Sequence, residues 1–418
     1  PRNSVVVVNG VAGSGKTTIA LHRVAYLLYN NREVLKDKML ILGPNYIFME
    51  YIRDVLPTLG ESGIDQMTFV DFALNLLNFD RDQLMSFDEY MEKIVDNNKE
   101  FIAIVEKKTS DEFINELDNL VKDMDENAEV KEIKYFDKVV QSVDDIKEML
   151  YTHFKTMPLY RRKKKIKRII FSKLRDARNE RVWEIERKFK ETVESLNEDD
   201  LKLQLNNLEY KKTLDIREAV MEVINIKKTL TWLDNIPVEE VYEPYKNGDI
   251  YTIDDLAPLL YLRIKLEGIK LGKEIKHVVI DEAQDYSKLQ FLVVKKITEA
   301  LGLTIVGDSN QRITPIEGNI PMENIKEIYS DCEDIEVFSL NKSYRSTKEI
   351  MEYANSYLEG EKIVPLVRSG NKVVVENVGS KEELVDTLKE AIMDMEDAEM
   401  ETVAIITKNK EEAEELNE

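Results

Sequence analysis

Residues Val5–Thr18 constrain the fold of this chain more than any other stretch. The four valines Val5–Val8 form the unbroken β-branched run that is typical of a strand buried on both faces of a parallel sheet. Gly10–Thr17 then reads Gly-Val-Ala-Gly-Ser-Gly-Lys-Thr, which fills the pattern G-x-x-x-x-G-K-[ST], and a helical apolar period follows. A strand, a glycine loop and a helix in this order predict a phosphate-binding loop. In such a loop, backbone N–H groups and the helix N-terminus surround a phosphate.

Two side chains of this loop have expected roles. Lys16 would reach the β- and γ-phosphates of a nucleotide, and the Thr17 hydroxyl would hold Mg²⁺. The alternative is a glycine-rich turn that binds nothing. Packing alone, however, gives no reason for a Lys-Thr pair directly after the glycines.

The composition limits the class of protein. The chain has 418 residues, of which 43% are hydrophobic and 33% charged. This is enough for about two or three domains with real cores. No stretch approaches the ~18 consecutive apolar residues of a membrane span. A single cysteine, Cys332, and three dispersed histidines exclude an internal disulfide framework and give no zinc spacing. We therefore expect a cytoplasmic protein without membrane contact.

Changes in composition divide the chain into three parts. Strand and helix patterns alternate from Val5 to Phe79 and return after Gly248, whereas the 184 residues from 64 to 247 contain no glycine. A glycine-free stretch disfavours tight turns, so we expect helices at about 86–106, 110–124, 137–155, 160–197 and 200–234. The predicted organisation is a discontinuous α/β domain with a parallel sheet (1–79 and 249–332), a large all-helical insertion (80–248) and the beginning of a second α/β domain (333–418). Strands of that second domain are expected at 334–339, 372–376 and 402–406.

Charge is unevenly distributed. The net charge is −22, which suits a basic protein partner better than a polyanion. Residues 155–190 nevertheless carry 15 Lys/Arg against four acids, and residues 80–150 carry 21 acids against ten bases. Two interpretations stay open: solvated faces with helix-to-helix ion pairs, or an arm whose basic run Arg161–Arg168 contacts nucleic acid or an acidic partner.

A second group of residues completes a nucleotide site. Val278–Ile280 is an apolar strand that ends in Asp281 and Glu282. Opposite a phosphate loop, these carboxylates would bind Mg²⁺ and deprotonate the attacking water, respectively. Gln311, after the next predicted strand, could sense a γ-phosphate, and Tyr344-Arg345 offers an aromatic for base stacking and a cation for transition-state charge.

These motifs, in this order, resemble motifs I to IV of superfamily 1 helicases, whose motor domains have the P-loop (RecA-like) fold. Finer features resemble the bacterial helicase-IV-like ATPase that recycles RNA polymerase. They lie at Leu21–Leu28, Leu42–Asn45, Asp254–Leu262 and His277–Ser287. The motif match covers Val5–Asp80 and about Tyr251–Ala354, and the helical block matches the arm-like insertion of the family by position.

The resemblance implies ATP and Mg²⁺ as cofactors. It implies Asp281 as a metal ligand with Thr17, Glu282 as the general base, Gln311 and Arg345 as γ-phosphate contacts, and Tyr344 as the residue that stacks on adenine. It places Thr68-Phe69 at a nucleic-acid-facing motif. The predicted cofactor-binding residues are Gly10, Ala12, Gly13, Ser14, Gly15, Lys16, Thr17, Thr18 and Tyr344.

The chain departs from translocating helicases at two places. These helicases carry Thr-Asn-Lys where this chain has Gly43–Tyr46, and they place aromatic side chains after the motif III glutamine, whereas Arg312–Glu317 has none. Base stacking contributes roughly 1–3 kcal/mol per base, so both departures favour the polymerase-recycling branch. The resemblance also implies further motifs before Val5 and after Glu418, so we expect a fragment with weak hydrolysis.

Three functions follow from the sequence as hypotheses. The leading one is an ATPase that binds core RNA polymerase and uses ATP to release it from nucleic acid. The second is a 3′-to-5′ DNA helicase or translocase in repair, with the basic stretch on the phosphate backbone. The third is a nucleotide-gated polymerase-binding module in which nucleotide closes the motor domains and moves the arm.

Overall fold

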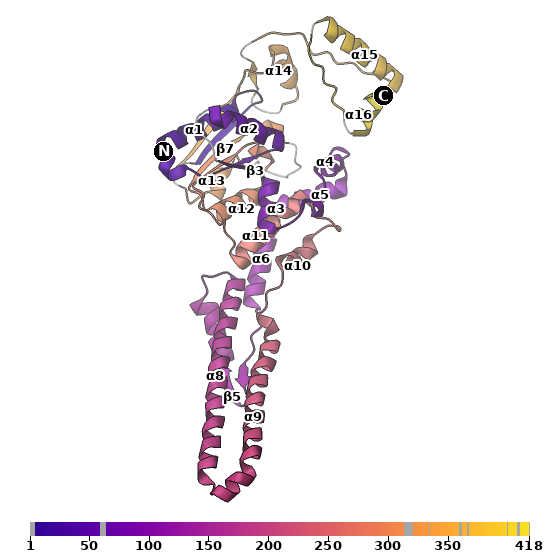
Figure 1. Cartoon of the computed structure of the whole chain (residues 1–418). Coiled ribbons are helices and arrows are strands. Elements are labelled where there is room, and N and C mark those ends of the chain that lie inside the picture. The colour runs from indigo at the N-terminus through magenta and orange to yellow at the C-terminus, as the bar shows by residue number, and fades with distance from the viewer. Residues whose placement is uncertain are drawn as a thin grey trace. The chain divides into compact units, whose positions relative to one another are not determined.

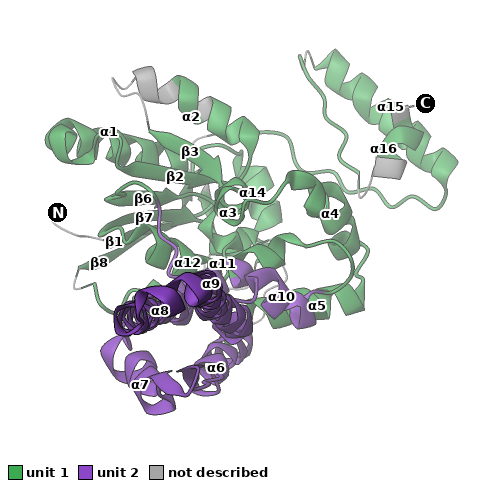
Figure 2. Ribbon diagram, turned by 60° about the horizontal axis from the view of Figure 1, so that its bottom comes forward, with its two compact units in different colours: residues 1–111, 247–257, 272–418 green, residues 112–246, 258–271 purple. Residues whose placement is uncertain are grey.

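The chain forms two compact units in the computed structural model. Unit 1 comprises residues 1–111, 247–257 and 272–418, and unit 2 comprises residues 112–246 and 258–271 (Figure 2). The structure describes residues 5–58, 64–312, 321–332, 334–358, 362–365, 368–398, 400–407 and 410–417. Residues 313–317, part of the segment in which the sequence lacks aromatic side chains, lie outside these ranges.

A six-stranded parallel sheet is the centre of unit 1. Its order is β3-β2-β6-β7-β1-β8, and every neighbouring pair is parallel. The inner strands are short runs of valine, isoleucine and leucine that are buried along their length, as expected for a sheet covered on both faces. The predicted α/β fold with a parallel sheet is therefore confirmed. The strands are β1 (Val5–Gly10), β2 (Met39–Gly43), β3 (Asp65–Thr68), β6 (His277–Ile280), β7 (Gly302–Gly307) and β8 (Ile335–Leu340).

Helices cover both faces of this sheet. Helices α1 (Lys16–Leu35) and α2 (Tyr46–Thr58) lie on one side and α12 (Lys288–Thr298) on the other (Figure 2). The apolar stripe of α1 packs on the valines of β1 and on β2 in one core cluster. The other helices of unit 1 are α3 (Phe69–Leu77), α4 (Phe87–Val95), α5 (Lys99–Thr109), α13 (Ile325–Ile328), α14 (Lys348–Ala354), α15 (Lys381–Asp397), α16 (Lys410–Asn417) and the short helices η1 (Arg81–Gln83), η5 (Ala283–Asp285) and η6 (Ser309–Gln311).

Two long antiparallel helices dominate unit 2. They are α8 (Leu159–Ser195) and α9 (Glu198–Thr229), which lie side by side (Figure 1). Ile166, Ile170, Leu174 and Ile185 of the apolar period in α8 are buried. Unit 2 also contains most of α6 (Asp111–Glu126), α7 (Val143–Glu148), the π-helix η2 (Met149–His153), η3 (Leu230–Leu233), α10 (Val238–Tyr242) and η4 (Glu243–Tyr245), and α11 (Ile253–Glu267) runs into it from unit 1.

The insertion is not all helical, contrary to the prediction. Strands β4 (Ile133–Tyr135) and β5 (Lys138–Gln141) form an antiparallel hairpin inside the glycine-free stretch. Phe136 takes the left-handed turn position with a φ of 49°, a position that glycine usually supplies. The absence of glycine therefore did not exclude a hairpin. The helix expected from residue 137 begins only at Val143.

Residues 81–109 pack within unit 1, although the sequence placed them in the insertion. The rings of Phe79 and Tyr251 lie with centroids 5.1 Å apart, and Lys108 Nζ is 2.5 Å from Asp255 Oδ1 with both side chains buried. These contacts join α5 and the chain around η1 to residues 251–257 of the same unit.

The strands expected in a second domain differ from the prediction. Strand β8, predicted as the first of them, instead pairs with β1 and completes the first sheet. Residues 372–376 and 402–406 form no strand, and among the described residues of 368–407 only α15 is regular. A strand needs a partner strand for its backbone hydrogen bonds, and the side chains of Val374 and Ile406 are 77% and 94% exposed. The two-residue strands β9 (Lys342–Ser343) and β10 (Val364–Pro365) pair with each other.

A membrane-spanning helix was not expected. In the part of the chain that the structure describes, no helix has the length and apolar character to cross a bilayer.

Candidate nucleotide-binding site

The loop between β1 and α1 has the backbone geometry of a phosphate site. Gly13 and Gly15 have positive φ angles of 71° and 85°, and α1 begins at Lys16 with no side-chain cap at its N-terminus. The first N–H groups of a helix have no partner within it, so they are available to an anion. The buried Ser14 hydroxyl has no hydrogen-bond partner in the described structure. The loop therefore fits a phosphate group.

Lys16 is held beside a carboxylate at the end of β7. Its side chain is buried, with Nζ 3.9 Å from Asp308 Oδ2 and 3.5 Å from the carbonyl oxygen of Val11. Burial raises the pKa of the Asp308 carboxyl, while the N–H groups of Asn310 and Ala12 and the charge of Lys16 oppose that rise. The lysine ammonium is thus placed at the phosphate loop before any nucleotide is present.

Thr17 and Asp281 are brought together from opposite ends of the sequence. Thr17 Oγ1 donates a hydrogen bond to Asp281 Oδ2 over 2.9 Å. Burial raises the pKa of the Asp281 carboxyl to about 6, and the neighbouring charge of Glu282 adds to this rise. Mg²⁺ prefers oxygen ligands, so this hydroxyl–carboxylate pair next to Lys16 fits the predicted metal position.

Glu282 is linked to the end of β7 through one amide. Gln284 Nε2 donates to Glu282 Oε2 over 2.8 Å, and Gln284 Oε1 accepts from the backbone N–H of Asp308 over 2.9 Å. Gln284 is 2% exposed, and a Cβ atom on Gly307 would lie 2.6 Å from its Oε1. The sequence analysis assigned no role to Gln284, although it stands in the Asp-Glu-Ala-Gln motif.

The motif after β8 lies against the phosphate loop. The backbone N–H of Tyr344 donates to the carbonyl oxygen of Gly13 over 3.0 Å, and Ser343 is fully buried beside this contact. A Cβ atom on Gly13 would lie 2.3 Å from Arg345 Cβ. Tyr344 is 59% exposed, and the Arg345 side chain is exposed as well. Both predicted residues therefore stand next to the loop without being packed into the core.

The remaining predicted residues of the site lie close to these. Gln311 ends η6 with an exposed side chain, and the segment is fixed by a hydrogen bond from the Ser309 N–H to Asn9 Oδ1 over 3.2 Å. Thr18 is exposed on the first turn of α1. A Cβ atom on Gly10 would meet Ser14 Oγ at 2.6 Å, so this glycine allows the loop to fold back over β1.

The structure contradicts a direct nucleic-acid contact by Thr68-Phe69. Thr68 caps α3: its Oγ1 accepts from the Asp71 N–H and donates to Asp71 Oδ2. Phe69 is 5% exposed and packs on the Tyr286 ring at a centroid distance of 5.7 Å. Both side chains are used inside unit 1, because one ends a strand and the other anchors a helix.

The basic run at the start of α8 is largely occupied within unit 2. Arg161 donates to the carbonyl oxygens of Glu267 and Gly268, and the buried Arg162 donates to Leu150 O and Asp125 Oδ2. Lys165 lies over the Phe154 ring, and Lys167 pairs with Asp234. Lys164 and Arg168 are exposed. Of the eight residues Arg161–Arg168, these two are the best placed to meet a phosphate backbone.

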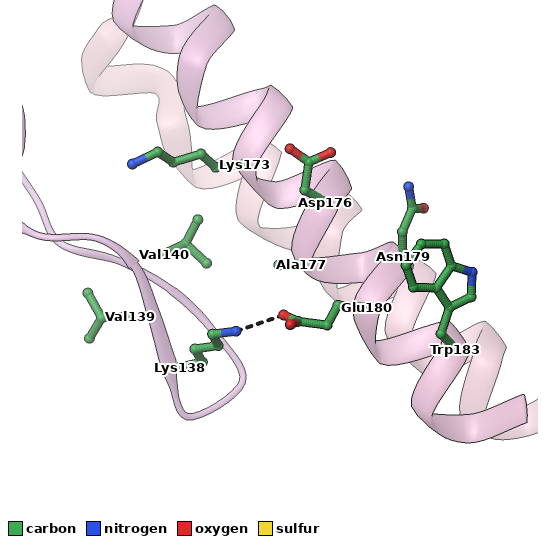
Figure 3. Close-up of a pocket in the computed structure, with 9 residues that line it drawn as sticks. All are labelled: Lys138, Val139, Val140, Lys173, Asp176, Ala177, Asn179, Glu180 and Trp183. Carbon is green, nitrogen blue, oxygen red and sulfur yellow. Dashed lines mark hydrogen bonds and ion pairs between the residues drawn. The ribbon is translucent and has the colours of Figure 1, made fainter. Parts of the chain in front are cut away.

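Unit 2 also contains a pocket of about 550 Å³ between β5 and α8 (Figure 3). Lys138 and Lys173 line it together with Asp176 and Glu180, and Lys138 pairs with Glu180 over 2.7 Å. The four charges cancel, so the pocket has no excess positive charge for phosphates. It contains none of the predicted nucleotide-binding residues.

Comparisons with known proteins agree with this geometry. Residues 1–315 match the model of the UvrD/REP helicase N-terminal domain. A probable DNA helicase II homolog of Mycoplasma capricolum is 31% identical over 215 residues, which are 45% of this chain and 28% of that protein. The ATP-dependent DNA helicase srs2 of Schizosaccharomyces pombe is 30% identical over 167 residues, 39% of this chain and 18% of that protein.

A third relative aligns over more of the chain. The ATP-dependent DNA helicase PcrA of Staphylococcus aureus is 22% identical over 352 residues, 83% of this chain and 37% of that protein. The chain thus spans between 18% and 37% of the length of these three relatives. The narrower resemblance to the polymerase-recycling branch stays a prediction. Because the family model covers three quarters of the sequence and the motifs of that family meet in one site, the chain belongs to the UvrD/REP helicase family.

Proposed function

We propose that this chain contains the nucleotide site of an ATP-driven motor that acts on DNA. The observation that carries this proposal is the contact between Thr17 and Asp281 beside Lys16, which joins a hydroxyl, a carboxylate and an ammonium group at the phosphate loop. The names of the three relatives, all DNA helicases, support DNA as the nucleic acid. This is the second of the hypotheses that the sequence left open.

The proposed division of labour follows from the position of each side chain. Bound Mg²⁺·ATP would supply the γ-phosphoryl group that is transferred to water. The loop Gly10–Thr18 holds the phosphates, and Lys16 neutralises their charge. Thr17 and Asp281 supply oxygen ligands for the metal ion. Glu282, oriented by Gln284, accepts the proton of the attacking water.

Three further side chains complete the proposal. Arg345, next to Gly13, stabilises negative charge that develops on the phosphate. Gln311, fixed by η6, positions the water, and the exposed ring of Tyr344 stacks on the base. All three stand on segments that follow β7 or β8, so a change in these segments could reach both the nucleotide and the rest of unit 1.

ATP turnover with and without single-stranded DNA tests the proposal. We expect DNA to stimulate turnover, and we expect Glu282→Gln to bind nucleotide normally while losing hydrolysis, because an amide cannot take the proton. Asp285→Asn, three residues further along, is the matched control and should retain turnover. Stimulation by core RNA polymerase with no response to DNA would overturn the assignment of DNA.

Polymerase release remains the second candidate. The net charge of −22 and the excess of 11 acids over bases in residues 80–150 favour a basic protein surface as partner. Glu282→Gln separates a motor from a nucleotide-gated binding module, because a gated binder would keep polymerase release and a motor would lose it.

A further inference from the structure

Helix α9 has two apolar faces, and only one of them is covered. Ala219, Val223 and Ile226 are buried on the face that packs in unit 2. Four large apolar side chains of the same helix are exposed instead. They are Leu203 (79% exposed), Tyr210 (67%), Leu214 (44%) and Met221 (45%). Single exposed apolar residues are ordinary, but four along one helix are not.

The four exposed residues form one straight stripe. Their spacing is 0, 7, 11 and 18 residues, and 18 residues equal five turns of an α-helix, so all four point in nearly the same direction. At 100° per residue, Ala219 lies about 140° round the helix from Leu214. The stripe is therefore almost opposite the packed face, and it extends for about 27 Å.

The stripe is symmetric about position 212. Leu203 and Met221 are each nine residues from Lys212, and Tyr210 and Leu214 are each two residues from it. A twofold axis at this position would turn α9 onto a second, antiparallel copy of itself. Leu203 would then meet the partner's Met221, and Tyr210 would meet the partner's Leu214. Self-complementarity of this kind is what a twofold interface requires.

The residues beside the stripe also complement each other. Asn206, Asn207, Arg217 and Glu218 flank it. In the antiparallel pair Asn207 would lie beside the partner's Glu218, and Asn206 beside the partner's Arg217, so that each of these charges meets a neutral amide. Lys211 is about 80° from the centre of the stripe, outside this row. A strongly charged foreign partner would find no rim of one sign here.

From this pattern we propose that α9 is a homotypic interface through which two copies of the chain associate antiparallel. The proposal goes beyond ATP hydrolysis and does not depend on it. Eight apolar side chains would be buried in the pair, which is a small interface by the standard of stable dimers. We therefore expect a dimer that forms at micromolar or higher concentrations.

Cysteine cross-linking tests the register. In a Cys332→Ser background, one chain carries Leu203→Cys and another carries Met221→Cys. The antiparallel pair brings these two positions together, so mild oxidation of the mixture should give a disulfide-linked dimer. Leu203→Cys alone should give none, because its two copies would be about 27 Å apart. A cross-link of Leu203→Cys with itself, or no cross-link in the mixture, would overturn the proposal.

Molar mass as a function of concentration gives an independent test. By analytical ultracentrifugation of the full chain, Leu214→Glu should weaken association about a hundredfold or more, because the substitution acts twice in a twofold pair. Thr213→Glu, exposed but outside the stripe, is the matched control and should associate like the parent chain. Thermal unfolding checks that both variants fold. A parent chain that stays monomeric to high concentration, or a control as weak as Leu214→Glu, would contradict the interface.

Discussion

Gln284 hydrogen-bonds the carboxylate of Glu282 through Nε2 over 2.8 Å while its other amide atom accepts from the backbone of Asp308. A single buried side chain therefore connects the ends of β6 and β7, where the carboxylates of the site stand. Its neighbour Gly307 leaves no room for a Cβ atom next to that amide. The proposed base thus depends on a residue that touches neither nucleotide nor metal in the proposed arrangement.

Two substitutions of Gln284 separate positioning from structural support. Gln284→Leu removes both hydrogen bonds, and we expect kcat for ATP hydrolysis to fall about 10- to 100-fold with nucleotide affinity little changed, since the proposed base loses its orientation. Gln284→Glu keeps an acceptor for the Asp308 N–H but puts a second carboxylate beside Glu282. The like charge should raise the pKa of the base, so the acid limb of the pH–rate profile should move to higher pH. An unmoved profile together with normal kcat in both variants would refute the positioning role.

Asp281 is expected to reduce the stability of the nucleotide-free protein. Burial raises the pKa of its carboxyl from 3.8 to about 6, so the folded chain holds the proton more tightly than the unfolded chain. Stability therefore falls as the pH rises from about 4 to 6, by about 3 kcal/mol at ~1.4 kcal/mol per pH unit. At pH 7 and above this penalty is fully present. Asp281→Asn removes the charge and should raise Tm at pH 8, with a smaller gain at pH 5.

The control and the cost of that variant are equally specific. Asp37→Asn changes an exposed aspartate with a φ of 60°, a conformation that Asn tolerates as well as Asp, and should leave Tm unchanged at both pH values. Asp281→Asn should also lose Mg²⁺-dependent hydrolysis, because the metal loses an anionic ligand. An Asp281→Asn variant that is less stable at pH 8 than the parent would disprove the penalty.

Local patterns sufficed to predict the centre of unit 1. The valine run of β1, the glycines of the loop and the carboxylates after β6 are recognisable from neighbouring residues alone, and the structure brings Lys16, Thr17, Asp281 and Glu282 into one site. Parallel strands with connecting helices place their carboxyl ends on one edge, so order along the chain was enough to predict this meeting.

Features that depend on distant partners were predicted less well. Strand β8 has the sequence of a new start, yet it pairs with β1, more than 300 residues earlier. Residues 372–376 have a strand pattern but no strand to pair with among the described residues. Likewise, nothing local shows that Phe136 takes a left-handed turn or that Arg162 is buried against Asp125. Pairing and burial of this kind are decided by the rest of the fold.

Gly13 and Gly15 offer a matched comparison of strain and space. Both have positive φ, so alanine at either position is strained by about 1–2 kcal/mol. At Gly15 a Cβ atom would have nothing within 4 Å, whereas at Gly13 it would collide with Arg345 Cβ at 2.3 Å. We expect Gly13→Ala to lower the free energy of unfolding by clearly more than Gly15→Ala, because residues 343–345 must move. Chemical denaturation of both variants measures this difference, and equal losses would contradict the observed contact between the loop and Arg345.

The basic run of α8 predicts a division between residues that bind DNA and residues that hold unit 2 together. Lys164→Gln with Arg168→Gln removes two exposed charges, and the slope of log K against log salt for DNA binding should decrease by about two contacts. Unfolding should be unaffected. Arg162→Gln should do the opposite: it leaves Asp125 and Leu150 O without their guanidinium donor, which costs about 2–3 kcal/mol of stability. Fluorescence anisotropy at several salt concentrations measures the first effect and urea unfolding the second. If the double variant binds DNA with an unchanged salt slope, the start of α8 is not part of the DNA interface, and its charges serve only to solvate and brace the helix.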